Sequence, residues 1–277
     1  MSTIVQEIGT MAASSVREIL DSGRGSPAAP NTQLWSILSD GGWGSISSDS
    51  ENGVELRDIL EVARISGRYA YSTPIVSTLL AGRWFELDDD QLESGIVVAV
   101  RRGAQVVAPY YSDDVAVVDG LGVIIAASPI EFESFSLLSP LAVLPSGTTA
   151  LSEGHLSELR AAFLAVAVGC ADAVLDASIA WSTTREQFGQ PIKGFQAVRH
   201  HLANAHIARE QAWTAAIAAA HEPARSATWA RQGFALARTS IELGIQVHGG
   251  VGFTWEVGLQ HYLNHIIELQ SVLGEDR

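Results

Sequence analysis

The chain has little cysteine and little positive charge, and both shortages limit what it can be. Its 277 residues include one cysteine, Cys170, so no disulfide can form within the chain, which is typical of a protein of the reducing cytoplasm. There are 17 basic and 31 acidic residues, and the formal net charge of -14 repels both nucleic acid and anionic membranes. A phosphate-bearing ligand must therefore be held by a few locally placed arginines or by helix amino termini.

The sequence also lacks an uninterrupted apolar segment of the kind that spans a membrane. Its most apolar stretch, residues 161–181, is broken by Asp172 and Asp176, which favours a helix buried inside a bundle. Residues 1–13 show no basic segment followed by a continuous apolar one, so we expect no secretory signal. We expect a cytoplasmic protein that binds neither membrane nor nucleic acid.

Hydrophobic periodicity divides the chain into three parts. Residues 1–92 repeat apolar positions at helical spacing and predict an N-terminal helical domain. Residues 93–148 contain short runs of Val and Ile separated by glycines, which predict a reduced antiparallel β domain. Residues 149–277 contain long helical segments at about 152–184, 195–222, 224–248 and 256–273, which predict a C-terminal four-helix bundle. The predicted fold is mainly α with a small central β domain.

One candidate site follows the first long segment of the predicted bundle. Arg185 precedes a tight turn that includes Phe188 and Gly189, so a guanidinium and an aromatic ring lie side by side. The guanidinium can bind a pyrophosphate through two hydrogen bonds, and the ring can lie against an adenine. The residues alone allow a second interpretation, in which Arg185 caps the helix as a cation and Phe188 packs beneath the turn.

A second candidate site follows the third long segment, where Gln246 begins the sequence QVHGGVGF over residues 246–253. Its glycines permit positive φ and the close approach of a ligand or of another backbone. By itself this is a weak signal, since the glycines of a plain corner between helices can serve packing alone.

Taken together, the two turns resemble the acyl-CoA dehydrogenase family. Members of that family contain R-x-x-F-G-x-x-I-x-x-F-Q and Q-x-x-G-G-x-G-F turns, which appear here in the same order at residues 185–196 and 246–253. The resemblance implies the fold of that family and FAD as cofactor, with the adenosine-diphosphate half of FAD held across a subunit interface. The cofactor-binding residues implied are Arg185 at the pyrophosphate, Phe188 at the adenine, Gln246, Gly249 and Gly250 through polar or main-chain contacts, and Gln196 as a weaker candidate.

The chain departs from the family where the catalytic base is expected. The reaction needs a carboxylate that removes the α-proton of an acyl thioester while the flavin accepts a hydride. At the two positions where family members carry this carboxylate, the chain has Leu159 and Leu273. We therefore expect no catalytic residue in this chain. Glu158 and Glu275 lie nearby and could act as displaced bases, but we interpret them as solvated charges at helix ends.

The β segment is also shorter than in the family, because it lacks the T-E-P-x-x-G-S-D segment that covers the flavin ring. The chain passes from residues 96–100 through residues 101–103 directly to the next predicted strand. In this it resembles the short, base-less subunits of actinobacterial steroid-degrading acyl-CoA dehydrogenases, which assemble as α2β2 heterotetramers. The resemblance implies a larger catalytic partner subunit that binds most of the acyl-CoA substrate, a steroid-derived thioester of the kind met in cholesterol catabolism, and an electron-transfer flavoprotein as acceptor.

Two alternatives remain open at this point. The chain could be a self-sufficient homodimeric dehydrogenase that uses Glu158 or Glu275, or a flavin-free scaffold subunit. A metal site is a further possibility, because His261, His265 and Glu268 share one side of a predicted helix. No metalloenzyme context surrounds these residues, so we expect no metal. Arg101 and Arg102, beside a glycine, predict a hairpin turn.

Overall fold

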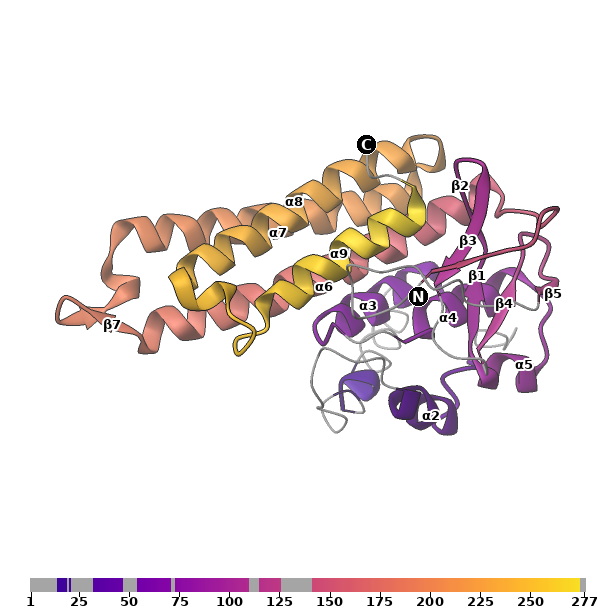
Figure 1. Ribbon diagram of the computed structural model, residues 1–277, viewed down its shortest axis with the longest axis horizontal. Coiled ribbons are helices and arrows are strands. Elements are labelled where there is room, and N and C mark those ends of the chain that lie inside the picture. Colours follow the sequence, from indigo (N-terminus) through magenta and orange to yellow (C-terminus); the bar gives the residue numbers. More distant parts are fainter. Residues whose placement is uncertain are drawn as a thin grey trace, which may run out of the picture.

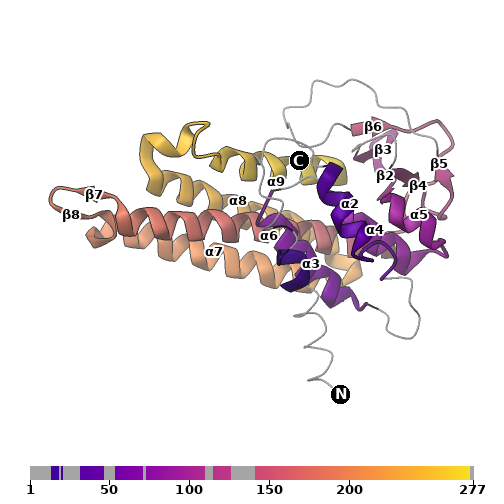
Figure 2. The same cartoon turned by 90° about the horizontal axis from the view of Figure 1, so that it is seen from below.

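The computed structural model describes residues 14–18, 20, 32–46, 54–70, 73–109, 115–125 and 141–274. Within these ranges the protein is mostly helical, with the four helices α6 to α9 lying side by side and the short helices α2 to α5 and strands β1 to β6 gathered toward one end of them (Figures 1 and 2). Glu275, considered above as an alternative base, lies outside the described residues.

Short helices form the layer next to the bundle. They are α2 (Thr32–Asp40), α3 (Leu56–Gly67), α4 (Ile75–Trp84) and α5 (Asp89–Ser94). Helix α3 begins at a capping box, in which Glu55 and Asp58 each accept from the other's backbone N–H, and it buries an apolar face rich in Ile, Leu and Val against α6. Asp88 and Gln91 form the same arrangement at the start of α5.

The strands form two small sheets. Strands β1 (Ile96–Val98), β4 (Ala116–Val118) and β5 (Ile124–Ile125) make one, and β2 (Val100–Arg102), β3 (Gln105–Pro109) and β6 (Leu141–Val143) make the other. The predicted hairpin after Arg102 is present as the β2–β3 pair, whose turn contains Gly103 at φ +61°.

The expectation of a purely antiparallel unit is wrong for one pair. Strand β1 pairs with β4 in parallel, with Ile96 opposite Ala116. The chain makes the β2–β3 hairpin between them and then returns to the start of β1, which is the crossover that a parallel pair needs. Runs of Val and Ile indicate strands but do not specify their partners.

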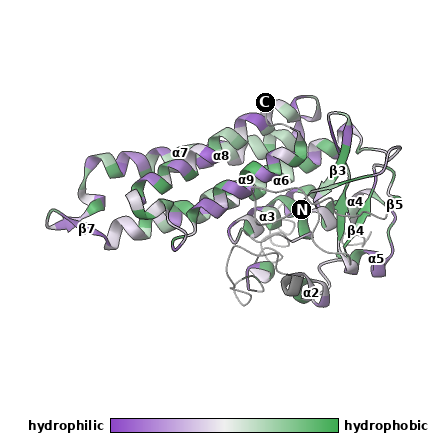
Figure 3. Ribbon diagram, viewed as in Figure 1, coloured by the Kyte–Doolittle hydropathy of each residue, from purple (hydrophilic) through white to green (hydrophobic). Residues whose placement is uncertain are grey.

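The predicted four-helix bundle is confirmed. Its helices are α6 (Glu153–Thr184), α7 (Gln196–His221), α8 (Ser226–His248) and α9 (Leu259–Leu273), joined through the short 3-10 segments η1 (Ile192–Gly194), η2 (Pro223–Arg225) and η3 (Gly249–Phe253) and by the β7–β8 hairpin described below. Apolar and polar residues alternate along these helices, as expected where one face of each is buried (Figure 3).

Helix α6 is the central element of the fold, since it packs against α3, α7, α8 and α9. Its length and composition would allow it to cross a membrane, but 78% of its most apolar window is buried inside the protein. It therefore behaves as the buried core helix that the interrupting aspartates predicted.

Glycines allow α3 and α6 to cross with their backbones in contact. A Cβ atom at Gly67 would collide with the carbonyl oxygen of Val166, and one at Gly169 would collide with that of Arg64. One turn further along α6, the Asp172 carboxylate accepts two hydrogen bonds from Arg64, at 2.7 and 3.1 Å, and lies 3.3 Å from Nε of Arg209. This nearly buried carboxylate thus joins α3, α6 and α7.

Candidate functional site

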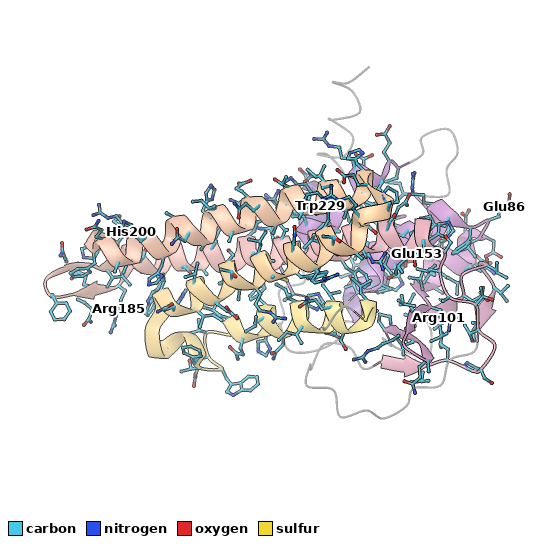
Figure 4. All side chains as sticks on the ribbon, turned by 90° about the horizontal axis from the view of Figure 1, so that it is seen from above. Glu86, Arg101, Glu153, Arg185, His200 and Trp229 are labelled. Atoms are coloured by element: carbon cyan, nitrogen blue, oxygen red, sulfur yellow. The ribbon has the colours of Figure 1, made fainter. Side chains whose placement is uncertain are left out.

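The two candidate turns lie at the same end of the bundle. Successive helices run in opposite directions, so α6 and α8 end together, far from strands β1 to β6 (Figure 1). Figure 4 shows Arg185 at this end, whereas Glu153, Arg101 and Glu86 lie toward the other. The fold thereby brings together two segments that are about sixty residues apart in the sequence.

A two-residue hairpin follows Arg185. Strands β7 (Glu186–Gln187) and β8 (Gln190–Pro191) pair in an antiparallel register around Phe188 and Gly189. Both turn residues have positive φ, +53° and +79°, which is the pattern of a type I′ turn. Positive φ is costly for an aromatic residue, yet Phe188 is 93% exposed. Its ring makes an edge contact with Phe195 at 6.1 Å and does not pack beneath the turn.

Arg185 is the C-cap residue of α6, and its side chain remains accessible. Its backbone N–H donates to the carbonyl of Trp181 at 2.8 Å, and its guanidinium lies over the Trp181 ring, 5.7 Å from the centroid. Among the residues that the structure describes, no carboxylate forms an ion pair with Arg185. The five N–H donors of this guanidinium are therefore available for an anionic ligand.

The structure explains two of the three glycines in the second turn. Gly249 has φ +66°, so its backbone favours glycine. A Cβ at Gly252 would lie 2.6 Å from the carbonyl oxygen of Ile245, so this glycine permits close packing. Gly250 has neither a positive φ nor any atom within 4 Å of an added Cβ. Packing within this chain does not explain Gly250, and the space above it is open.

The remaining predicted residues are exposed on the same end. Gln246 lies on the last turn of α8, and Gln196 is the first residue of α7. Several large apolar residues around them also face outward. These are Ile179, Val251, Phe253 and Trp255, of which the last two are 74% and 67% exposed. An exposed apolar set beside an unpaired arginine is typical of a surface that binds a ligand or another chain.

Two residues at this site were missed by the sequence interpretation. The rings of Trp181 and His248 stack with centroids 5.5 Å apart and planes 18° apart, which joins the end of α6 to the end of α8. Nδ1 of His248 lies 2.9 Å from the carbonyl oxygen of Gly244, an acceptor only, so we assign the ring proton to Nδ1. The position of Trp181 one helical turn before Arg185 was the available signal.

The two expected base positions hold buried side chains. Leu159 is fully buried and Leu273 nearly so, and both belong to the main hydrophobic core. The interpretation of Glu158 as a solvated charge is wrong, because its carboxylate accepts from the indole N–H of Trp84 at 2.7 Å and lies 3.3 Å from Nε of Arg83. Helix α4 packs against α6, and Trp84 at the end of α4 stacks on His155 in the first turn of α6, which places these donors beside Glu158.

The other sequence constellation has no metal-site geometry. Among the described residues, no group of three or more His, Cys, Asp or Glu side chains could hold a metal ion. His261 lies beside Trp255, with ring centroids 5.5 Å apart, and burial lowers its pKa. Nδ1 of His265 lies 3.6 Å from the carboxylate of Glu268, which gives these two residues a local structural role.

The sequence of the bundle is similar to that of known proteins. Residues 146–274 match the family model described as "Acyl-CoA dehydrogenase, C-terminal domain". The chain is 35% identical over 163 residues to acyl-CoA dehydrogenase FadE34 of Mycobacterium tuberculosis, covering 54% of this chain and 23% of that protein. It is 31% identical over 139 residues to acyl-CoA dehydrogenase IpdE2 of Mycolicibacterium smegmatis, covering 49% and 45% respectively. The matched part thus spans less than half the length of these relatives.

Solved structures resemble the chain over nearly its whole length. A variant of the Tcur3481-Tcur3483 steroid ACAD superposes with a TM-score of 0.76 at 19% identity, covering 98% of this chain and 94% of that one. A chain of the ChsE4-ChsE5 complex from Mycobacterium tuberculosis superposes with a TM-score of 0.72 at 18% identity, covering 99% and 94%. Because both sequence identities are below 20%, this likeness establishes the fold alone.

Proposed function

We propose that the chain is one subunit of a heteromeric, FAD-dependent acyl-CoA dehydrogenase, because residues 146–274 match the model for the C-terminal domain of that family and the chain superposes on solved structures of that fold. In this proposal it completes the FAD site, and a larger partner subunit provides the catalytic base and most of the acyl-CoA site. The assembly introduces an α,β double bond into an acyl-CoA thioester. We place it in the cytoplasm, with an electron-transfer flavoprotein as electron acceptor.

The residues at the bundle end fit the adenosine-diphosphate half of FAD. The diphosphate is an anion and the chain is strongly acidic, so the site needs a cation that no carboxylate neutralises, and within the described ranges Arg185 meets this requirement. Open space above Gly250 allows a ligand to approach the backbone, and the exposed ring of Phe188 offers a flat face to an adenine. Gln246, Gly249 and Gln196 complete the set through polar or main-chain contacts. When bound, FAD supplies the hydride acceptor of the dehydrogenation.

A single observation supports this proposal above the others, namely the conformation of Phe188. The chain keeps an aromatic residue at a φ of +53° and leaves 93% of it exposed, so neither local geometry nor burial within the chain favours it there. A role in contact with another molecule explains both costs. The unpaired guanidinium beside it indicates that this molecule carries negative charge.

The residues at the base positions support a division of labour between subunits. Buried Leu159 and Leu273 cannot accept a proton, and the Glu158 carboxylate is already engaged by Trp84 and Arg83. The two solved neighbours are a steroid ACAD and a ChsE4-ChsE5 complex, and together with the resemblance to the short subunits of such enzymes they lead us to propose a steroid-derived thioester and an α2β2 assembly.

Flavin content tests the proposal. The chain is co-expressed with the larger acyl-CoA dehydrogenase chain of the same organism, and FAD is quantified by absorbance per purified heterodimer. We expect about one FAD per heterodimer and a large loss with Arg185→Ala. Arg231→Ala, which removes an exposed arginine near the start of α8, is the matched control and should retain the cofactor.

The alternatives give different results in the same system. Unchanged flavin content in Arg185→Ala would favour the scaffold, and a yellow, active homo-oligomer of this chain alone would rule out the division of labour. Glu158→Gln should leave turnover intact in the heteromer. A collapse of kcat in this variant would identify Glu158 as a displaced base instead.

A further inference from the structure

The two candidate turns are joined by a connected set of side chains. The guanidinium of Arg185 lies over the ring of Trp181, and that ring stacks on His248, the last residue of α8 before the glycine turn. His248 is 7% exposed, so the contact is made inside the end of the bundle. One short path therefore connects the cationic part of the site to its glycine-rich part.

Close packing on the inner side holds this path in place. A Cβ atom at Gly244 would lie 2.6 Å from Cγ1 of Val174 and 2.9 Å from Oγ of Ser178, so α8 is pressed against α6 one turn before His248. The Ser178 hydroxyl is fully buried and lies 3.4 Å from Nδ1 of His248, which also donates to the carbonyl of Gly244. The plane of the imidazole is thus determined before any ligand is present.

We propose that Trp181 and His248 are positioning residues, which orient Arg185 relative to the glycine turn so that both can contact one diphosphate. This inference rests on the proposed function and names the residues that preorganise its binding site. An exposed arginine loses much rotamer freedom when it binds a ligand. A guanidinium already held over an indole, on a ring fixed by its neighbour, loses less. Neither residue needs to touch the ligand.

The test measures ADP affinity, because ADP contains the diphosphate without the flavin. The full chain is purified free of flavin, in the oligomer in which it occurs, and titrated with ADP by isothermal calorimetry. We expect Trp181→Leu to weaken ADP binding about two- to fivefold, as for loss of an exposed cation–π contact. Trp181→Phe keeps a flat ring and should stay within about twofold of the wild type.

A matched control exists at the opposite end of the bundle. Arg225 lies over Trp229 at 4.8 Å from the ring centroid, so Trp229→Leu removes the same kind of contact away from the turns. This variant should bind ADP as the wild type does. His248→Leu, which breaks the stack from the α8 side, is used in the same way if Trp181→Leu does not fold.

A double-mutant cycle distinguishes positioning from a general structural role. If Trp181 acts through Arg185, then adding Trp181→Leu to Arg185→Ala should cause no further loss of ADP affinity. Additive losses, or equal losses with Trp229→Leu, would overturn the inference while leaving the proposed function intact. Wild-type affinity in Arg185→Ala, or no ADP binding by the wild-type chain, would instead refute the proposed function and the inference with it.

Discussion

Replacing Phe188 with glycine should leave the chain more stable than replacing it with alanine, although both substitutions remove the same ring. The reason is the backbone, which has a φ of +53° at this position. Left-handed backbone costs a residue with a Cβ about 1–2 kcal/mol, and glycine is largely free of this penalty. Glycine also gives the unfolded chain more conformational freedom, and this cancels about 0.4–1 kcal/mol of its advantage over alanine.

The expected difference is therefore about 0.8 kcal/mol in favour of the glycine variant, the difference between the middle of the first range, about 1.5, and that of the second, about 0.7 kcal/mol. Loss of the ring affects both variants equally, because Phe188 is 93% exposed and its main described ring contact is the edge pair with Phe195. Urea unfolding followed by circular dichroism measures the difference. With a slope of about 1–3 kcal/mol per molar urea, the midpoints should differ by a few tenths of a molar unit.

The same pair of variants also tests the role of the ring. Both should lose FAD to a similar extent in the heteromer, since neither offers a flat face to the adenine. An alanine variant as stable as the glycine variant would refute the strained turn. A glycine variant that retained flavin like the wild type would show that the ring has no part in binding.

Three further predictions concern the rest of the fold. Asp172→Ala should cost about 2–3 kcal/mol, since it leaves the half-buried Arg64 and Arg209 without their carboxylate, whereas Asp176→Ala, at a 62% exposed side chain, should cost at most about 1 kcal/mol in the same urea titration. Gly169→Ala should lower the free energy of unfolding by about 1–3 kcal/mol, because the new methyl group collides with the backbone of Arg64. This cost exceeds the gain from alanine's better helix propensity, and an unchanged urea midpoint would contradict the backbone contact. Burial lowers the pKa of His155 in the folded chain below the ordinary histidine value of about 6.5, which the unfolded chain keeps. The unfolded chain therefore binds this proton first as the pH falls, and stability is lost between about pH 6.5 and the lower pKa of the folded chain. His155→Phe should therefore lose less stability than the wild type between about pH 6.5 and pH 5; an equal loss would show that His155 does not contribute.

Sequence periodicity was sufficient to predict the four-helix bundle and to predict that the two turns lie at the same end of it. Long helices joined by short connections must alternate in direction, so the first and third end together, and Arg185 and Gln246 come to one surface. The exposure of Phe188 could not be predicted, because a hairpin and a packed turn have the same local sequence requirements.

The features that escaped prediction depend on contacts between distant residues. Trp181 meets His248 across 67 positions, and Glu158 meets Trp84 across 74, so no local pattern reports either contact. The parallel pairing of β1 with β4 belongs to the same class, because short Val-rich strands do not specify their neighbours.

The length of α6 has a consequence for any assembly that this chain enters. Glu158 lies near the start of α6 and Arg185 caps its end, and 27 residues at about 1.5 Å each separate them by roughly 40 Å. That is farther than a single dinucleotide extends. A carboxylate at the start of this helix and a diphosphate at its end would therefore belong to two different reaction centres. Helix α6 acts as a spacer, and even in a homodimer each catalytic centre would combine one end of one chain with the opposite region of another.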